Sequence, residues 1–224
     1  MTIAGGMAMQ HQVAHDWEAV TGCKVCEGYG MTESSPVITM NPPNAIQIGT
    51  IGVPAPNTHI RIVNDDGQDV TLGESGELWA KGPQVMKGYW QRAEATAETV
   101  TSDGWLKTGD VAIIQADGYI KIVDRKKDMI LVSGFNVYPN EIEDVAASHA
   151  GVLESAAVGI PDKKSGEAVK LFVVKKDPSL TEESLLLHLK AGLTGYKLPR
   201  TIVFKDELPK SPVGKILRRE LRDK

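Results

Sequence analysis

A change of pattern near residue 124 constrains the fold of this chain more than any other feature. Before it, residues 46–123 contain short β-branched or aromatic runs separated by turn pairs. The runs are 60–63, 77–80, 111–114 and 119–123, and the turn pairs are Asp66-Gly67, Asp103-Gly104 and Asp117-Gly118. This spacing predicts a small antiparallel barrel or sheet, interrupted by a short helix at about 91–100. A further helix is expected over 7–20.

Strands and helices alternate after residue 124. Pro139 fits the first turn of a helix, and Thr181 ahead of two glutamates fits the start of another. The remaining expected elements are strands at 129–132, about 152–160, about 168–175 and 202–204, and a basic helix from about Lys215. The sequence therefore predicts an α+β fold with two parts, residues 1–124 and 125–224.

Charge changes at the same place. Residues 1–123 carry 7 Lys/Arg against 14 Asp/Glu, and residues 124–224 carry 18 against 15. The net charge of −4 argues against general nucleic-acid binding, whereas the basic second part suits a polyanionic ligand. A solvated lysine-rich surface is the alternative. No apolar run is long enough for a transmembrane helix, and no signal peptide is expected.

Cys23 and Cys26 form a C-x-x-C pair, and His11 and His15 lie just upstream. These four side chains are potential zinc ligands, but residues 23–26 read as a strand. Cysteines three apart on a strand point to opposite faces and do not easily share a metal. We therefore expect free thiols and a reducing cytoplasm.

Four blocks carry the functional signal. In chain order they are Gly28-Tyr-Gly-Met-Thr-Glu33, Gly104-Trp-Leu-Lys-Thr-Gly-Asp110, the run from Asp124 to Glu143, and Pro209-Lys-Ser-Pro-Val-Gly-Lys215. Together they resemble the motifs of the adenylate-forming enzymes, the superfamily of acyl-CoA synthetases, adenylation domains and luciferases. The third block resembles bacterial long-chain fatty-acid–CoA ligases almost without change. The resemblance implies that residues 1–124 are a β-rich remnant of the large N-terminal core domain, with a small β-barrel-like subdomain. Residues 125–224 are then its small, mobile C-terminal lid.

The resemblance implies roles for the first block. Gly28 and Gly30 would let the backbone approach a ligand closely, and Tyr29 would offer a face for adenine stacking. Thr32 would hydrogen-bond the α-phosphate, and Glu33 would hold Mg²⁺, a hard cation that takes oxygen ligands. The alternative for the block is a glycine turn with a surface glutamate.

The next two blocks would complete the nucleotide site and the hinge. Asp110 would accept both ribose hydroxyls, and Arg125 would make a second ribose contact. Lys127 lies where the family places the hinge of its lid. Gly134 matches a backbone position on a lid strand beside the path of the coenzyme A pantetheine. Taken alone, Asp110 could be a strand-end residue and Gly134 an ordinary turn glycine.

Lys215 would be the catalytic lysine, bridging the substrate carboxylate and the α-phosphate during adenylation. A helix-start lysine is the alternative. Its block is not a phosphate-binding P-loop, because position 209 is Pro and Ile216 replaces the Ser/Thr.

The family's Ser/Thr/Gly-rich phosphate loop, which ends in Pro-Lys-Gly, has no match in the 224 residues. We therefore expect a C-terminal fragment of a long-chain fatty acyl-CoA ligase, inactive alone. The implied ligands are ATP and AMP, Mg²⁺, a fatty acid and coenzyme A. The alternatives are a non-catalytic nucleotide- or CoA-binding module and one half of a split ligase. Cytoplasmic localisation is expected, with peripheral membrane contact and a homodimer as further expectations for the enzyme.

Overall fold

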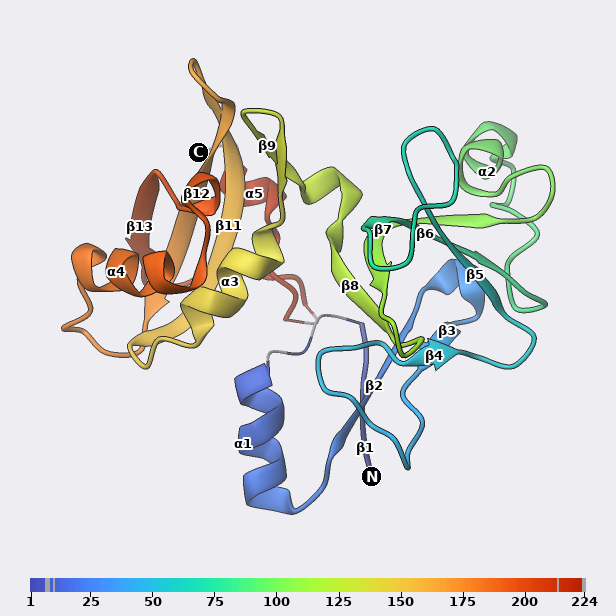
Figure 1. Ribbon diagram of the computed structural model, residues 1–224, viewed down its shortest axis with the longest axis horizontal. Coiled ribbons are helices and arrows are strands. Elements are labelled where there is room, and N and C mark those ends of the chain that lie inside the picture. Colours follow the sequence, from blue (N-terminus) through green and yellow to red (C-terminus); the bar gives the residue numbers. More distant parts are fainter. Residues whose placement is uncertain (7–8, 10, 213, 223–224) are drawn as a thin grey trace. The chain divides into compact units, whose positions relative to one another are not determined.

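The computed structural model describes residues 1–6, 9, 11–212 and 214–222, and Figure 1 shows their order along the chain. The chain divides into two compact units, Met1–Lys126 and Lys127–Lys224. Both are sheet-rich with few helices, which confirms the α+β class. The assignment of 1–124 to a core domain and 125–224 to a mobile lid stays a prediction.

The first unit opens with a four-stranded sheet in the order β1-β2-β3-β4. Its strands are β1 (Thr2–Ala4), β2 (Val25–Gly30), β3 (Val37–Met40) and β4 (Val53–Pro54). β1 pairs with β2 in parallel, and the other pairs are antiparallel. Helix α1 (His11–Thr21) lies between β1 and β2. The helix expected over 7–20 is therefore described only from His11, and residues 7, 8 and 10 lie outside the described residues.

The second sheet of this unit is an antiparallel meander in the order β5-β6-β7-β8. Its strands are β5 (His59–Val63), β6 (Gly76–Lys81), β7 (Leu106–Ile114) and β8 (Ile120–Arg125), and α2 (Ala93–Thr99) lies between β6 and β7. The predicted antiparallel sheet and its short helix are confirmed. Each predicted turn pair ends in a glycine at positive φ, 75° to 88°, because that conformation costs glycine no Cβ clash.

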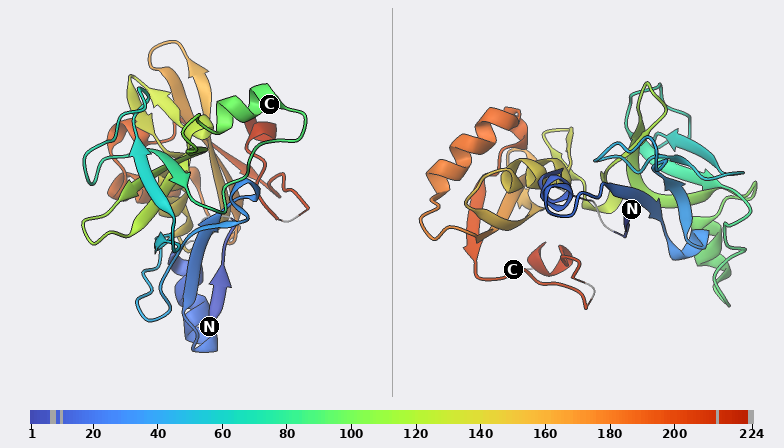
Figure 2. Two further views of the ribbon diagram at one scale, coloured as in Figure 1. Left: turned by 90° about the vertical axis from the view of Figure 1, so that its right-hand side faces the viewer. Right: turned by 90° about the horizontal axis from the view of Figure 1, so that it is seen from below.

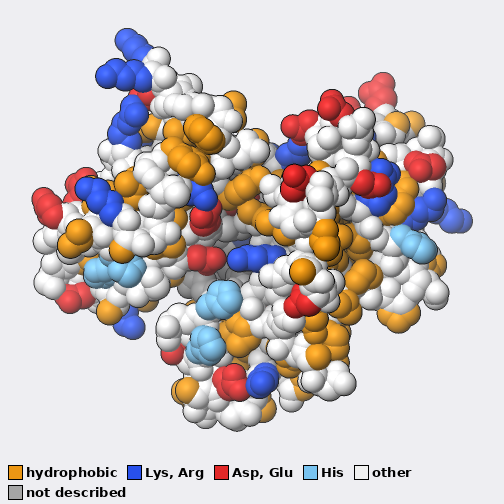
Figure 3. All heavy atoms as spheres, viewed as in Figure 1, with side chains coloured by type: hydrophobic (Ala, Val, Ile, Leu, Met, Phe, Trp, Pro, Cys, Tyr) orange, Lys and Arg blue, Asp and Glu red, His pale blue; other side chains and the backbone are white. Residues whose placement is uncertain are grey.

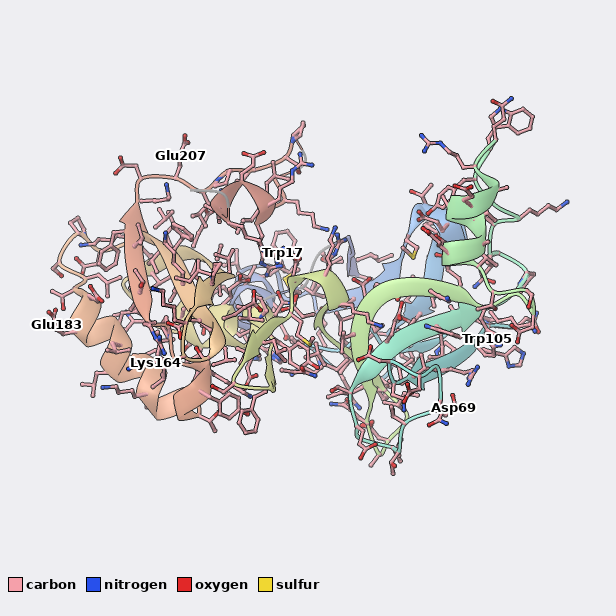
Figure 4. The ribbon with its side chains drawn as sticks, turned by 90° about the horizontal axis from the view of Figure 1, so that it is seen from above. Trp17, Asp69, Trp105, Lys164, Glu183 and Glu207 are labelled. Carbon is pink, nitrogen blue, oxygen red and sulfur yellow. The ribbon has the colours of Figure 1, made fainter. Side chains whose placement is uncertain are left out.

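Arg61 of the outer strand β5 contacts an acidic and an aromatic side chain. Its Nε donates to Asp69 at 2.6 Å, and its guanidinium lies 5.3 Å from the ring centroid of Trp105. Figure 4 labels Asp69, in the connection between β5 and β6, and Trp105, directly before β7. The core beneath consists of buried aliphatic residues such as Leu78, Leu106 and Ile120.

The second unit is a five-stranded sheet with two main helices. β12 lies centrally between β11, β9 and β13, and β10 pairs with β9. The elements are β9 (Ile130–Val132), β10 (Phe135–Val137), α3 (Pro139–Ala147), β11 (Val152–Asp162), β12 (Gly166–Lys175), α4 (Glu182–Gly192), the 3-10 helix η3 (Gly195–Lys197), β13 (Thr201–Lys205) and α5 (Arg219–Arg222). Basic side chains gather at the tip of the β11–β12 hairpin (Figure 3).

The helix starts follow the sequence signals. Pro139 is in the first turn of α3, where its missing N–H costs no hydrogen bond. Thr181 caps α4 by accepting a hydrogen bond from the Ser184 amide at 3.2 Å, which satisfies one of the amides that a helix start leaves unpaired.

Two hydrophobic clusters cover opposite faces of this sheet, because side chains alternate along β12. Val169, Leu171 and Val173 pack with α3 and α4, whereas Phe172 and Val174 pack with Leu208 and Leu221 of the C-terminal segment. Figure 2 shows α3 and α4 on one face and the C-terminal segment on the other. The described residues contain no helix that is long and apolar enough to cross a membrane.

The closing helix was predicted wrongly. It begins at Arg219 rather than at about Lys215. Residues 209–212 and 214–217 instead form a small hairpin, in which Lys210 and Ile216 form an antiparallel bridge and the Leu217 amide donates to the Pro209 carbonyl at 2.8 Å. The run of basic residues gave no sign of this pairing, because the bridge joins Lys210 and Ile216, which lie on either side of the turn.

Candidate functional site

The first block lies at the end of β2 and in the 3-10 helix η1 (Thr32–Ser34) that follows. A Cβ atom at Gly30 would lie 1.8 Å from the Pro36 carbonyl oxygen, whereas one at Gly28 would lie 3.4 Å from its nearest neighbour, the Thr39 carbonyl oxygen. Packing between β2 and the chain that returns beside it therefore requires glycine at position 30. The close approach of a ligand to Gly28 and Gly30 stays a prediction.

Tyr29 makes the strongest link between the first two blocks. Its hydroxyl donates to Asp110 Oδ2 at 2.5 Å, across 81 positions of sequence. Burial raises the pKa of the Tyr29 hydroxyl well above its ordinary value, and the charge of Asp110 and the hydrogen bond to it act in the same direction. The phenol therefore keeps its proton and acts as a donor that fixes one oxygen of the Asp110 carboxylate.

Asp110 and Arg125 are direct partners across the antiparallel pair β7–β8. Arg125 Nε lies 3.6 Å from Asp110 Oδ1, and the Asp110 side chain is 13% exposed. The Asp110 amide donates to Thr108 Oγ1 at 3.2 Å, which fixes the backbone beside the carboxylate. The structure thus brings Tyr29, Asp110 and Arg125 together, and these three residues are called the tyrosine cluster below.

Glu33 is held by a residue that the sequence did not indicate. Glu33 Oε1 accepts a hydrogen bond from the Tyr89 hydroxyl at 2.7 Å, and its carbonyl accepts one from the Met86 amide at 2.8 Å. The hydrogen bond to Glu33 raises the pKa of Tyr89. Among the described residues no donor reaches Glu33 Oε2, so this oxygen can bind a cation. Thr32 beside it is exposed.

No local pattern identifies Tyr89 as the partner of Glu33. The two residues are 56 positions apart, and Tyr89 lies in a loop rather than in a periodic element. The Met86 amide, which donates to the Glu33 carbonyl, joins this loop to η1, and the Tyr89 amide, which donates to Thr96 Oγ1 at 2.9 Å, attaches it to α2.

The predicted hinge residue lies where the chain passes from one unit to the next. Lys127 is exposed and lies in the 3-10 helix η2 (Lys126–Asp128). On one side, Lys126 Nζ pairs with Asp65 at 2.9 Å and with Glu77 at 3.3 Å. On the other side, Asp128 is 8% exposed and accepts a hydrogen bond from Arg222 at 2.8 Å. Each neighbour of Lys127 is thus anchored within its own unit. The hinge role stays a prediction.

Gly134 lies in the tight turn between β9 and β10, not on a strand as predicted. Ser133 and Gly134 have φ values of 52° and 85°, and Val132 pairs with Phe135. Two successive positive φ angles define the hairpin turn that best matches strand twist, and they favour glycine. A Cβ atom at position 134 would meet nothing within 4 Å, so the local need for glycine is conformational. Its role beside a pantetheine path stays a prediction.

Lys215 lies near the end of the small hairpin. Its carbonyl accepts a hydrogen bond from the Ser211 amide at 2.8 Å, and its own amide donates to Ser211 Oγ at 3.1 Å. Gly214 before it has a φ of 79°. The lysine is therefore on a short, hydrogen-bonded loop with a glycine in the left-handed region. Position 213 lies outside the described residues.

The cysteine and histidine pairs occupy different elements. Cys26 is buried in β2 and its thiol donates to the Asn41 carbonyl at 3.1 Å, and burial raises its pKa. Cys23 lies before β2, so the strand expected to contain both cysteines begins only at Val25. His11 and His15 are exposed on α1, where pale-blue side chains are visible in Figure 3. The described residues contain no cluster of three or more potential metal ligands.

Comparisons with known proteins agree with this geometry. Residues 1–90 match the AMP-binding enzyme family and residues 141–215 match the AMP-binding enzyme C-terminal domain. The chain therefore belongs to the AMP-binding, adenylate-forming enzyme family.

Within this family it is similar to the long-chain-fatty-acid–CoA ligase of Yersinia pestis, with 61% identity over 100% of this chain and 40% of that ligase. The chain thus spans about 40% of the length of the curated relatives it matches.

Two solved structures share the fold. ATP-bound MatB from Rhodopseudomonas palustris has a TM-score of 0.93 and 36% identity, over 99% of this chain and 44% of that one. The anthranilate CoA ligase AuaEII in complex with anthranoyl-AMP has a TM-score of 0.91 and 31% identity, over 99% of this chain and 43% of that ligase.

Proposed function

We propose that this chain is the C-terminal part of an AMP-forming ligase for long-chain fatty acids. In the first step a carboxylate oxygen of the fatty acid attacks the α-phosphorus of ATP, forming acyl-AMP and releasing pyrophosphate. In the second step the sulfur of coenzyme A attacks the acyl carbon, forming the thioester and releasing AMP. The chain's contribution is part of the nucleotide site together with the lid.

The tyrosine cluster is the observation that supports this proposal most. Asp110 is a shielded carboxylate whose orientation is fixed by Tyr29 and whose charge is balanced by Arg125. Each carboxylate oxygen has capacity for more than one donor, so Asp110 can accept the ribose hydroxyls while it keeps both protein contacts. The Tyr29 ring remains the proposed stacking surface for adenine, and Gly28 and Gly30 the backbone beside it.

Glu33 suits a magnesium ion. Mg²⁺ is usually held by one or two carboxylates together with phosphate oxygens of the substrate, and Glu33 offers one oxygen that no described donor occupies. A bound Mg²⁺ would neutralise phosphate charge. Thr32, exposed beside Glu33, is proposed to donate to the α-phosphate.

The second unit supplies the residues that differ between the two steps. Lys215 is proposed to stabilise the negative charge that develops as the carboxylate attacks the α-phosphate. Rotation about Lys127 would then exchange Lys215 for the β9–β10 turn, where Gly134 lies beside the path of the CoA thiol. Adenylation therefore needs Lys215, whereas thioester formation does not.

These 224 residues contain no Ser/Thr/Gly-rich loop for the β- and γ-phosphates. We therefore propose that the activity requires the portion of a ligase that precedes them. A chimera tests this, in which these residues replace the corresponding 40% of the Yersinia pestis ligase.

We expect the chimera to catalyse ATP–pyrophosphate exchange with oleate and to form oleoyl-CoA. Asp110→Asn should raise the KM for ATP, and Lys215→Ala should abolish exchange while sparing thioester formation from supplied oleoyl-AMP. A folded chimera without either half-reaction would contradict the proposal and favour a binding module.

A further inference from the structure

The loop that carries Lys215 is fastened to the rest of the second unit by the residues that follow it. Arg218, three positions after Lys215, makes paired contacts with Glu143 of α3: Nε to Oε1 at 3.1 Å and Nη2 to Oε2 at 2.7 Å. Nη2 also donates to Asn140 Oδ1 at 2.7 Å. Two parallel bonds to one carboxylate fix both the position and the orientation of a guanidinium.

The acceptors of Arg218 are themselves held in place. Glu143 Oε1 also accepts the amide of Ala157 in β11 at 2.8 Å, so the carboxylate joins α3 to the sheet. The side chains of Arg218 and Glu143 are 18% and 13% exposed. Burial raises the pKa of Glu143, and Arg218 opposes this shift and favours the charged form.

The same segment reaches the residues next to the unit boundary. Asp128 Oδ2 lies 3.6 Å from Arg218 Nη1. Asp128 Oδ1 accepts a hydrogen bond from Arg222 Nη2 at 2.8 Å. Arg222 also donates to the Lys127 carbonyl at 3.4 Å. Leu221 packs in the buried cluster on the sheet. Residues 218–222 are therefore bound to η2, α3 and the sheet at once.

We propose that Arg218 is a positioning residue for Lys215. Arg218 links the loop that carries Lys215 to α3 and to Asp128, just after Lys127, so that the loop, α3 and this segment move together. The inference rests on the proposed function, since it assigns Arg218 a part in the half-reaction that needs Lys215. A guanidinium suits the task better than an ammonium, because a lysine cannot make the paired contact. The neighbouring Arg219 is exposed and provides a matched control.

The test compares Arg218→Lys with Arg219→Lys in the chimera. For Arg218→Lys we expect ATP–pyrophosphate exchange to fall about tenfold or more, with thioester formation from oleoyl-AMP changed by less than about twofold. For Arg219→Lys both rates should stay within about twofold of the parent. A merely structural loss of lid folding would lower both half-reactions of Arg218→Lys together, and that result, or no loss at all, would overturn the inference.

Limited trypsin digestion gives a second readout that does not depend on catalysis. Loosening the loop should speed cleavage after Lys215 in Arg218→Lys but not in Arg219→Lys, because proteolysis follows the population of locally opened chain. Unchanged cleavage would contradict the attachment. If Arg218→Lys does not fold, Glu143→Gln provides the same comparison, since the amide keeps an acceptor for Ala157 and loses the charge.

Lys215→Ala, measured in parallel, separates a failure of the role proposed for Lys215 from a failure of the role proposed for Arg218. If it spares exchange, the proposed role of Lys215 has failed. If it abolishes exchange while Arg218→Lys leaves exchange intact, only the positioning role of Arg218 has failed.

Discussion

Replacing Tyr29 with Phe removes one hydroxyl and keeps the ring proposed to stack on adenine. The lost contact is the 2.5 Å hydrogen bond to Asp110 Oδ2. A hydrogen bond to a charged group contributes roughly 1.5–3 kcal/mol. We take the lower end of this range for two reasons. Arg125 still faces the Asp110 carboxylate, and the Asp110 side chain is 13% exposed, so water can replace part of the lost contact.

About 1.4 kcal/mol corresponds to a factor of ten in an equilibrium constant. We therefore expect the KM for ATP of the Tyr29→Phe chimera to rise about tenfold, with a much smaller effect on the KM for the fatty acid. Because the pKa of the Tyr29 hydroxyl is raised, the hydroxyl keeps its proton. The KM for ATP of Tyr29→Phe divided by that of the parent chimera should therefore stay constant between about pH 6 and 9.

Tyr119→Phe is the matched control. It also removes a 2.5 Å hydrogen bond, from the Tyr119 hydroxyl to the Ala45 carbonyl. Tyr119 lies at the turn end of the β7–β8 hairpin, away from the pair of Asp110 and Arg125. Steady-state exchange kinetics should show no change in the KM for ATP. An unchanged KM for ATP in Tyr29→Phe, or equal rises in both variants, would show that the Tyr29 hydroxyl does not orient Asp110 for ATP binding.

Three further predictions concern backbone space, pH and the hinge. Gly30→Ala should lower the melting temperature of the chain and abolish exchange in the chimera, because its Cβ would collide with the Pro36 carbonyl; normal values for both would contradict the packing argument. Hydrogen bonds from Ser165 and backbone amides, with Arg200 nearby, lower the pKa of Asp162, so its stabilising effect is present above the unfolded pKa of about 3.9 and is lost as pH falls towards the folded value. Asp162→Asn should therefore lower the urea midpoint of unfolding at pH 7, and the difference in midpoint between variant and parent should narrow below about pH 4. A difference that widened in acid would contradict a lowered pKa for Asp162. Lys127→Pro should trap one arrangement of the hinge and slow one half-reaction selectively, and normal rates for both would exclude Lys127 as the hinge.

The parts of the fold that depend on local signals could be predicted from the sequence. Turn glycines with positive φ delimited the β5–β8 meander, and Thr181 and Pro139 marked the starts of α4 and α3. The closing helix was misjudged because the pairing of Lys210 with Ile216 competes with helix formation. Local propensity does not include that competition.

The candidate site was predictable only in part. The motif resemblance selected Asp110 and Arg125. Counting outward from the Asp117-Gly118 turn would have placed Asp110 opposite Asp124, because the register shift between Val111 and Ala112 that brings Arg125 opposite has no signal in the sequence. The contacts of Tyr29 with Asp110 and of Tyr89 with Glu33 span 81 and 56 positions. They depend on how sheets and loops pack, which no periodicity in the sequence records.

Pyrophosphate release by this 224-residue chain, with ATP, Mg²⁺ and oleate, tests whether the chain is the C-terminal part of a working ligase. The measurement is made first with the chain alone and then with the N-terminal portion of the Yersinia pestis ligase added. We expect no release by the chain alone and oleate-dependent release after the addition. Release by the chain alone would show that the phosphate site is built within these residues, and no release in either case would contradict the assignment as the C-terminal part of a working ligase.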